Sequence, residues 1–506
     1  MNGALMKGSS RFAVAAALGL FMGASSSQAA DLGGNCCADL EERIAELEAT
    51  TARKGNRKMS LQITGQVHRM VLWYDDGHSS NTYYGIDNTN ASSRFIFLGS
   101  AKVTPKVTMG FEIAIEVEAG GTSSKLNQFD EDGKVGAQIG GPGSFNQAGL
   151  DAYFGDARRV AWFMEHADLG RLTVGRWEGA MVFSTVDLTG HVALAASGSF
   201  VNVNGAFFVR GNTGQVYAIT VGNLVDPAAA QSERTELIRY DSAVWNGFTF
   251  ASQLGEAGDF WGSQIRYAGE HAGFRLAGVV GYERVTDVAT PAAFTPATAA
   301  PGGLIDPAFL GRKPDITSVG IALSAMHVPT GVFVQGHYNA TDYGGQPLGA
   351  ASGYWGEGTV HKKDTAHWLL QVGVSKNWFG YGATSSWGEY GVATDFGADI
   401  TCGTTAAQCG LSAIGSAGRS FNTGAGNGFS PVNGVTDTET TIWGLGIAQR
   451  FDAAATDLYV GYRRFDMDVT CTGAGANCQG AAVPGAAKKL PTEGLDIIIM
   501  GARVLF

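Results

Sequence analysis

Few side chains in this 506-residue sequence have the types and spacing that catalysis or ligand binding requires. Glu112 and Glu116 lie four residues apart, as a pair of acid–base carboxylates could. The nine histidines are scattered along the sequence. Even the closest pair, His361 and His367, are better explained as surface or pore residues than as metal ligands. No Gly-x-Ser-x-Gly nucleophile motif is present, and the alternating glycines at 424–428 do not join a strand to a helix as a phosphate-binding loop does. The sequence therefore predicts no enzyme, no metal site and no cofactor.

The cysteines indicate an oxidising compartment rather than a reactive site. Cys402 and Cys409 lie seven positions apart in a segment rich in Gly, Thr and Ala, and Cys471 and Cys478 repeat that spacing. Each pair predicts a small loop disulfide, worth roughly 2 to 3 kcal/mol. Four cysteines could instead bind a metal ion, but the C-x2-C knuckle spacing is absent.

The first 29 residues have the pattern of a secretory signal peptide. Lys7 and Arg11 form a basic region, residues 12–24 are apolar but too short to span a bilayer, and Ser27-Gln28-Ala29 suits a signal peptidase. The alternative is an N-terminal membrane anchor. Cleavage after Ala29 would begin the mature chain at Ala30 and place it outside the cytoplasm.

The composition is unusual for a soluble enzyme. Glycine supplies 73 residues, and charged residues are only 16% of the chain against about 25% in typical globular proteins. Outside the first 29 residues no apolar run is long enough for a transmembrane helix, whereas the strands of a membrane barrel alternate and leave no such run. The formal net charge of −11, which becomes −13 without Lys7 and Arg11, argues against nucleic acid as a partner.

The elements that would position Glu112 and Glu116 are β-strands, because hydrophobicity has a period of two from residue 60 onward. In the segment 107–117, Val, Met, Phe and Ile occupy one face, and Thr, Gly, Ala and both glutamates occupy the other. An apolar outer face and a carboxylate-bearing inner face suit a barrel that is lipid-facing outside and water-filled inside. A soluble β-sandwich would show the same alternation in one strand.

The number of strands and the lengths of their connections favour the barrel. The predicted strands come in pairs across tight turns, and most connections between pairs are long and rich in Gly, Ala, Thr or Pro. Closure would also pair every backbone group in lipid. The sixteen strands are predicted at 60–74, 92–103, 106–119, 158–167, 170–177, 234–243, 247–255, 259–269, 272–284, 315–327, 331–343, 364–377, 380–391, 438–450, 455–468 and 494–506.

We therefore predict an all-β fold, a sixteen-stranded antiparallel transmembrane β-barrel over residues 60–506. The last strand ends the chain at Phe506, with Ile498, Met500, Ala502 and Val504 in its outward row and Gly501 and Arg503 facing inward. Aromatic residues at strand ends predict an interfacial girdle, or alternatively a sugar-binding track; these residues are Trp73, Tyr74, Trp378 and Phe379.

The segment 30–59 is predicted to be periplasmic, with one short helix over 36–51. Asp39 can cap this helix and Glu42 completes a capping box. Apolar residues recur at heptad spacing for two heptads, so the helix is either simply amphipathic or part of a bundle between neighbouring barrels. A vicinal bridge between Cys36 and Cys37 would be strained, which favours pairing between subunits.

Several stretches resemble the porins of alphaproteobacteria, over nearly the whole of the chain after the signal peptide. They are Cys36-Cys37 with DLEERIAELEATTARKGNRK (39–58), RYDSAVWNGF (239–248), GEAGDFWGSQIRYAGEHAGF (255–274), KNWFGYG (376–382), GEYG (388–391), WGLGIAQRFDAAATDLYVGYR (443–463) and GARVLF (501–506). The resemblance implies a homotrimeric general porin in the outer membrane of a Gram-negative bacterium, surrounded by outer-membrane lipid. It also implies that the barrel-assembly machinery reads the terminal Phe506.

The resemblance further implies that the third long loop, here 178–233, folds into the barrel and narrows the pore. DLGRLTVGRW (168–177) and EGAMVFSTVDLTG (178–190) resemble the family's strand and inward loop. By that likeness Arg171 and Arg176 would be wall cations and Asp187 an opposing loop anion, so that their field filters solutes by charge. Strict alternation, however, places Arg176 on the lipid side unless a bulge or the strand end turns it inward.

The predicted function is passive diffusion of ions and small hydrophilic solutes. The alternatives are a substrate-selective channel, or a receptor or adhesin barrel that binds ligands through its long loops. Inward Glu112 and Glu116 and the negative net charge predict weak cation preference. The predicted Ala30-Asp31 start also resembles that of alphaproteobacterial barrels joined to peptidoglycan, although an ordinary cleavage site would give the same start.

Overall fold

A computed structural model of the chain describes the barrel region and parts of its loops. The described residues are 59–117, 121–124, 126–128, 157–181, 185–195, 207–225, 234–255, 260–286, 315–342, 360–362, 364–395, 398–400, 419–421, 432–472 and 487–506. The predicted signal peptide and the helix at 36–51 lie outside these residues, as do Ala30, Cys36, Cys37, Cys402, Cys409 and Cys478. Within the described ranges, none of the helices is both long and apolar enough to cross a bilayer.

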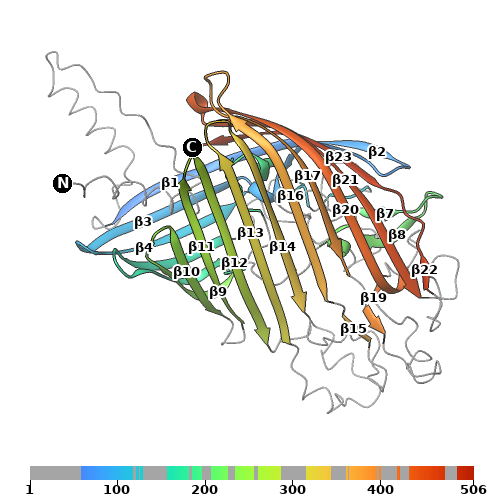
Figure 1. Cartoon of the computed structure of the whole chain (residues 1–506), viewed down its shortest axis with the longest axis horizontal. Coiled ribbons are helices and arrows are strands. Elements are labelled where there is room, and N and C mark those ends of the chain that lie inside the picture. Colours follow the sequence, from blue (N-terminus) through green and yellow to red (C-terminus); the bar gives the residue numbers. More distant parts are fainter. Residues whose placement is uncertain are drawn as a thin grey trace, which may run out of the picture.

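Sixteen antiparallel strands form a closed barrel, which confirms the predicted fold class (Figure 1). All sixteen predicted segments are strands, and most ends agree within three residues; the strand predicted at 438–450 extends over Val432–Phe451. The strands are β1 (Ser60–Asp75), β3 (Arg94–Thr104), β4 (Val107–Glu116), β5 (Ala157–His166), β6 (Gly170–Glu178), β9 (Arg234–Ser242), β10 (Phe248–Gly255), β11 (Phe260–His271), β12 (Phe274–Thr286), β13 (Asp315–His327), β14 (Val332–Asp342), β16 (Thr365–Lys376), β17 (Thr384–Thr394), β20 (Val432–Phe451), β21 (Thr456–Thr472) and β23 (Leu495–Leu505).

The first and last strands close the barrel. β1 pairs with β23 from Gln66–Leu505 to Asp75–Asp496, so no edge is left at the seam. The terminal Phe506 continues this pairing, since its backbone N–H and C=O both hydrogen-bond to Gly65, at 3.1 and 3.0 Å. Its ring lies on the outer face near Phe95, with 5.6 Å between ring centroids. The end of the chain is thus part of the wall.

Seven short turns connect consecutive strands at one end of the barrel, and the long connections lie at the other end. The turn between β11 and β12 contains only Ala272 and Gly273 between the paired residues His271 and Phe274. Both central residues have positive φ, 50° and 82°, as a two-residue hairpin turn requires. We call these two ends the turn end and the loop end.

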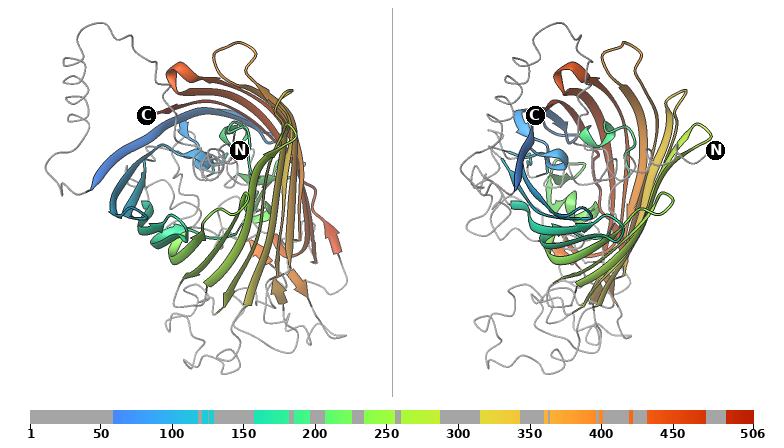
Figure 2. Two further views of the ribbon diagram at one scale, coloured as in Figure 1. Left: turned by 60° about the vertical axis from the view of Figure 1, so that its left-hand side comes forward. Right: turned by 90° about the vertical axis from the view of Figure 1, so that its left-hand side faces the viewer.

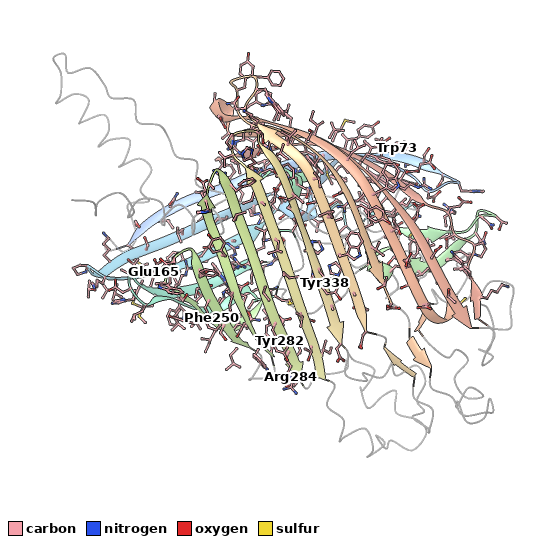
Figure 3. The ribbon with its side chains drawn as sticks, viewed as in Figure 1. Trp73, Glu165, Phe250, Tyr282, Arg284 and Tyr338 are labelled. Atoms are coloured by element: carbon pink, nitrogen blue, oxygen red, sulfur yellow. The ribbon has the colours of Figure 1, made fainter. Side chains whose placement is uncertain are left out.

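Side chains alternate between the outer and inner faces of the wall as predicted. In β14, Val332, Val334 and Tyr338 are exposed on the outer face, whereas Gln335 and His337 are buried on the inner face. Aromatic side chains, including Tyr282, Tyr338 and Phe250, project from this wall (Figure 3). The prediction that Tyr74 belongs to an interfacial girdle is wrong, because Tyr74 faces inward.

Additional short elements in the loops were not predicted. β2 (Ser80–Asp87) pairs with the loop end of β1, and η1 (Thr89–Ala91) follows it. The loop after β6 contains η3 (Val192–Ala195), β7 (Phe208–Arg210), β8 (Val216–Thr220) and α3 (Gly222–Val225). The sheet curves around segments of this loop (Figure 2). The remaining short strands are β15 (Val360–Lys362), β18 (Ala398–Ile400), β19 (Arg419–Phe421) and β22 (Ala487–Lys489).

Candidate pore lining and constriction

Glu112 and Glu116 face the barrel interior, where each carboxylate is paired with an arginine of β5. Arg159 Nη1 lies 2.7 Å from Glu112 Oε1. Arg158 donates to Glu116, which also accepts a hydrogen bond from the Ser92 hydroxyl. Their inward placement was predicted, but the arginine partners were not. A neutralised carboxylate attracts cations only weakly, so the basis of the predicted cation preference is removed.

A β-bulge explains why two consecutive arginines face the same side. Ala114 pairs with Arg159 and Ile115 with Ala157, so Arg158 is an extra residue in β5. In a regular strand, Arg158 would share the lipid-facing row with Val160. The bulge turns its side chain inward to Glu116 instead.

Arg171 also faces inward and lies against aromatic side chains. Its guanidinium carbon lies 3.9 Å from the centroid of the Phe163 ring and 5.3 Å from that of Trp177. Arg171 pairs across the sheet with Asp241, whose carboxylate binds Arg239 through Nε and Nη2. The interior wall of β5, β6 and β9 therefore presents a row of guanidinium groups.

Arg176 does not belong to this row, and its expected position in the pore wall is corrected. It pairs with Val160, which is 45% exposed on the outer face, and with Glu236. Arg176 Nε donates to the carbonyl oxygen of Ala157 at 3.0 Å. The alternation within β6 is unbroken at this residue, so Arg176 lies outside the lumen.

Glu178, the last residue of β6, was missed as a site residue. Its register belongs to the outer row, but the strand ends here and the carboxylate turns back over Arg159. Arg159 Nε lies 2.8 Å from both oxygens of Glu178, and Arg159 Nη2 lies 2.7 Å from Oε1. Arg94, Arg158, Arg234 and Arg266 are also within electrostatic range of this carboxylate.

We call Arg94, Arg158, Arg159, Arg234 and Arg266 the arginine cluster. Within the described residues, five guanidinium groups of this cluster face three carboxylates, those of Glu112, Glu116 and Glu178. Asp87 and Asp241 are also within electrostatic range of Arg94 and Arg266, but they form ion pairs with Arg69 and Arg239, which are outside the cluster. Among these described side chains, guanidinium groups therefore outnumber carboxylates. From the sequence, the direction of a side chain could be predicted only from strict alternation along a strand. Arg158, at a bulge, and Glu178, at the end of a strand, both depart from that alternation.

Asp187 lies in the loop after β6, but its carboxylate holds the local chain together. Oδ1 accepts from the backbone N–H and the hydroxyl of Thr189, at 2.8 and 2.7 Å, and Oδ2 accepts from Ala193 N at 3.0 Å. The nearest wall contact is Gln335 Nε2, 3.5 Å from Oδ1. The structure thus places Asp187 against β14, whereas Arg171 lies on β6.

The segment 185–195 that carries Asp187 lies along the inner wall. Thr185 hydrogen-bonds to His337 Nδ1 of β14 at 3.0 Å, and the Ser324 hydroxyl of β13 donates to the carbonyl of Val186. Farther along, His191 Nδ1 contacts Ser385 Oγ at 2.6 Å and His191 Nε2 lies 3.5 Å from Asp457. The segment therefore covers the wall from β13 to β21.

The predicted disulfides fall mostly outside the described residues. Cys471, at the loop end of β21, is buried and disulfide-bonded. Cys402, Cys409 and Cys478 are not among the described residues. No group of three or more His, Cys, Asp or Glu residues that could hold a metal ion occurs in the part of the chain that the structure describes.

This architecture defines the class of protein. A closed antiparallel barrel with apolar side chains outside, charged and amide side chains inside, short turns at one end and long loops at the other is an outer-membrane pore-forming barrel. The chain belongs to the Gram-negative porin family, whose sequence profile matches residues 13–470. It is a passive channel for ions and small hydrophilic solutes, located in the outer membrane as a multi-pass β-barrel. The turn end is then periplasmic and the loop end external.

Solved structures of similar shape include other outer-membrane channels. The anion-selective porin from Comamonas acidovorans is 14% identical with a TM-score of 0.45, over 88% of this chain and all of that one. OmpF of Salmonella typhi in complex with daunomycin is 12% identical with a TM-score of 0.43, over 89% and 98%. The trimer form of OmpT of Vibrio cholerae is 12% identical with a TM-score of 0.43, over 88% and 99%. Likeness at this level carries no information about solute preference. No curated protein matches the chain.

Proposed function

We propose that this porin conducts small anions in preference to cations. The observation that carries the proposal is the arginine cluster, whose guanidinium groups outnumber the described carboxylates that pair with them, Glu112, Glu116 and Glu178. Fixed charge in a narrow aqueous path concentrates ions of opposite sign. The sequence-based expectation was the reverse, because it counted Glu112 and Glu116 as free carboxylates.

The reversal potential of the purified protein in a planar bilayer tests this proposal. We expect a tenfold gradient of KCl to give the sign of an anion-preferring channel. A cation-preferring sign would overturn the proposal, and would assign the dominant influence to the negative net charge of the chain. A protein without measurable conductance would instead contradict the channel function itself.

We further propose that the segment 185–195 narrows the pore opposite Arg171. Support comes from its hydrogen bonds to β13, β14 and β17, which hold it inside the barrel. Asp187 contributes here by capping the turn, and Arg171 contributes a cation on the facing wall. Transport through such a constriction requires no catalytic group, and we propose that the protein is not an enzyme.

We propose a homotrimer within the alphaproteobacterial porins, assembled through recognition of Phe506 by the barrel-assembly machinery. The sequence stretches quoted above support the subfamily. The exposed Phe506 ring beside Gly65 is available for recognition before the seam closes. Crosslinking of native membranes should give a species three times the monomer mass, and a variant lacking Phe506 should accumulate unassembled.

We propose the domain division 1–29 as signal peptide, 30–59 as periplasmic segment and 60–506 as barrel. The basic and apolar pattern of residues 7–24 supports the first, and the periplasmic location of the turn end supports the second. We also propose a peptidoglycan link through Ala30. A muropeptide attached to the Ala30 peptide in a digested cell-wall fraction would support this link, and a free Ala30 amine on all protein would refute it.

We propose the disulfides Cys402–Cys409 and Cys471–Cys478. The spacing of both pairs supports them, and Cys471 is disulfide-bonded. Mass spectrometry of peptides from the non-reduced protein should show both bridges. Free thiols at these positions would contradict the proposal and the assignment to an oxidising compartment.

A further inference from the structure

The outer face of the wall is hollowed along β17, where small residues stand between the larger apolar side chains of the neighbouring strands. The outward row of β17 contains Ser386 and Gly388 in its turn-end half. A Cβ added to Gly388 would have its nearest neighbour only at 3.9 Å. The result is an open furrow of about 680 Å³, which we call the β17 furrow.

Apolar side chains of the neighbouring strands form the sides of this furrow. β17 lies between β16 and β20 (Figure 1), and Gly388 pairs with Val372 on one side and with Leu445 on the other. Further outward side chains line the furrow; these are Val374, Ile447, Val460, Tyr462 and Ile498. The β17 furrow is therefore largely apolar and lies on the face of the barrel that contacts the membrane.

The length of the β17 furrow suits one leaflet of the membrane. Beyond Gly388 the next outward residue of β17 is Tyr390, which ends the run of small residues; its ring packs against Trp368 of β16 with 5.7 Å between centroids. From Tyr390 to Thr384 at the turn end, the chain extends about 20 Å along the strand. With a strand tilt of about 40°, this corresponds to roughly 15 Å of an apolar band that is about 25 Å tall in outer-membrane barrels. The furrow thus belongs to the periplasmic leaflet.

A cation lies at the turn-end mouth of the β17 furrow. Lys376 follows Val374 in the outward row of β16 and pairs with Thr384 of β17. Lys376 Nζ donates to the carbonyl of Pro329 at 2.7 Å, which uses one of the three N–H groups of the ammonium. The residue is exposed, and none of the carboxylates that the structure describes forms an ion pair with it. An exposed ammonium at the membrane interface suits a phosphate group.

The β17 furrow adjoins a second recess at the turn end, between the β16–β17 and β20–β21 turns. This recess has a volume of about 430 Å³, and its lining includes Tyr381, Phe451 and Leu458. Leu458 precedes Val460 in the outward row of β21, so the two hollows are neighbours. Gly380 adds no side chain here, and a Cβ at this position would meet nothing within 4 Å. The recess has room for the polar part of a lipid beside its acyl chain.

We propose that the β17 furrow binds one phospholipid of the periplasmic leaflet, with an acyl chain along β17 and the phosphate group at Lys376. An unfilled furrow would leave its lining atoms without packing partners, and a seated acyl chain supplies them. The cation at the mouth favours a phosphate-bearing lipid over a second copy of this chain, which would have to bring a carboxylate to the same place. The inference goes beyond the channel function and does not depend on ion preference.

Photocrosslinking of the wild-type protein in lipid vesicles tests the location. The probe is a phosphatidylethanolamine with a diazirine in one acyl chain, diluted into vesicles of the unlabelled lipid. We expect labelled peptides to be concentrated in the turn-end halves of β16, β17 and β20. Native mass spectrometry in mild detergent should show one phospholipid retained by each barrel.

Two variants test the furrow and its cation separately. Gly388→Leu fills the furrow with a side chain, and we expect loss of both the concentrated labelling and the retained lipid. Lys376→Gln should keep the location of labelling but weaken retention by roughly threefold, as expected for an exposed ion pair. Ala340→Leu is the matched control, because it adds the same side chain to the outer row of β14, away from the furrow, and should change neither readout.

Several results would overturn the lipid site. Even labelling around the wild-type barrel would reduce the furrow to ordinary lipid contact, and this result decides the matter even if Gly388→Leu fails to fold. A folded Gly388→Leu protein with wild-type labelling and retention would also refute it. Loss of an oligomeric species in Gly388→Leu, with lipid labelling unchanged, would assign the furrow to contact between copies. Unchanged retention in Lys376→Gln would refute the phosphate contact.

Discussion

Glu178 is the carboxylate whose removal tests the role of the arginine cluster most directly. Glu178→Gln keeps the length of the side chain and one hydrogen-bond acceptor for Arg159 but removes the negative charge. The described cluster would change from five guanidinium groups against three carboxylates to five against two. We expect a stronger preference for anions.

The size of the effect follows from the distance between the cluster and a passing ion. One unit charge in water at about 7 Å is worth roughly 0.6 kcal/mol. That energy multiplies the local anion concentration by about three and divides the cation concentration by the same factor. At 0.01 M salt, where the Debye length is about 30 Å, screening reduces both factors only slightly, to about two each. The ratio of anion to cation permeability should therefore rise roughly fivefold at low salt.

The assay is the reversal potential of wild-type and variant channels in KCl gradients of low and high mean concentration. At 1 M salt the Debye length falls to about 3 Å, and the difference between the two proteins should nearly vanish. Glu270→Gln is the matched control, because Glu270 forms an exposed ion pair with Arg275 at the turn end. A folded Glu178→Gln barrel with wild-type selectivity at low salt would refute the reasoning.

Three other perturbations test separate parts of the structure. Asp187→Asn should keep the single-channel conductance of the wild-type protein. Asp187→Ala should add open-channel noise, because alanine cannot accept the three hydrogen bonds that hold the turn. Equal noise in both variants would contradict the capping role of Asp187. Gly65→Ala should reduce the free energy of unfolding by roughly 1 to 3 kcal/mol, because the new Cβ would meet the ring of Phe506 at 2.5 Å. The barrel should then unfold in detergent at a lower temperature. Gly388→Ala should leave that temperature unchanged, since its Cβ would have its nearest neighbour at 3.9 Å. Burial alone would raise the pKa of Asp76, but hydrogen bonds from Arg210 and Ser79 outweigh it and hold that pKa below its usual value. The ion pair between Asp76 and Arg210 of β7 is then complete above about pH 4 and is lost as the pH falls through the lowered pKa. The conductance of wild-type channels should therefore become less steady in strong acid, because Arg210 no longer holds β7 to the loop after β1. Channels that remain steady there would contradict this role of Asp76.

The strands could be predicted because one simple rule governs them. Lipid outside and an enclosed interior impose a period of two, and tight turns such as Ala272-Gly273 mark the ends of strands. The rule gave all sixteen strands and the inward direction of Glu112 and Glu116. The elements inside the long loops could not be predicted in the same way, since β7, β8 and α3 are only three to five residues long and are stabilised by distant wall residues.

The candidate site was predicted less well because it lies where the rule is broken. Arg176 follows the alternation and therefore points outward, against the role that the resemblance implied. Arg158 and Glu178 depart from it, one through a bulge and the other at the end of a strand, and both side chains join the lumen. A bulge depends on register with the neighbouring strand, and a single sequence does not contain that register.

The buried loop segment 207–225, which contains β7, β8 and α3, by contrast left a signal in the sequence that strict alternation overlooked. The last strand reads Leu495-Asp-Ile-Ile-Ile-Met500, so after Asp496 it is apolar on both faces. Lipid explains only the outward row, which contains Ile498 and Met500. The inward row, Leu495, Ile497 and Ile499, requires a second apolar layer inside the barrel, and the segment 207–225 is part of that layer. In a pore-forming barrel, a strand that is apolar on both faces therefore indicates that protein, and not water, fills the adjacent lumen.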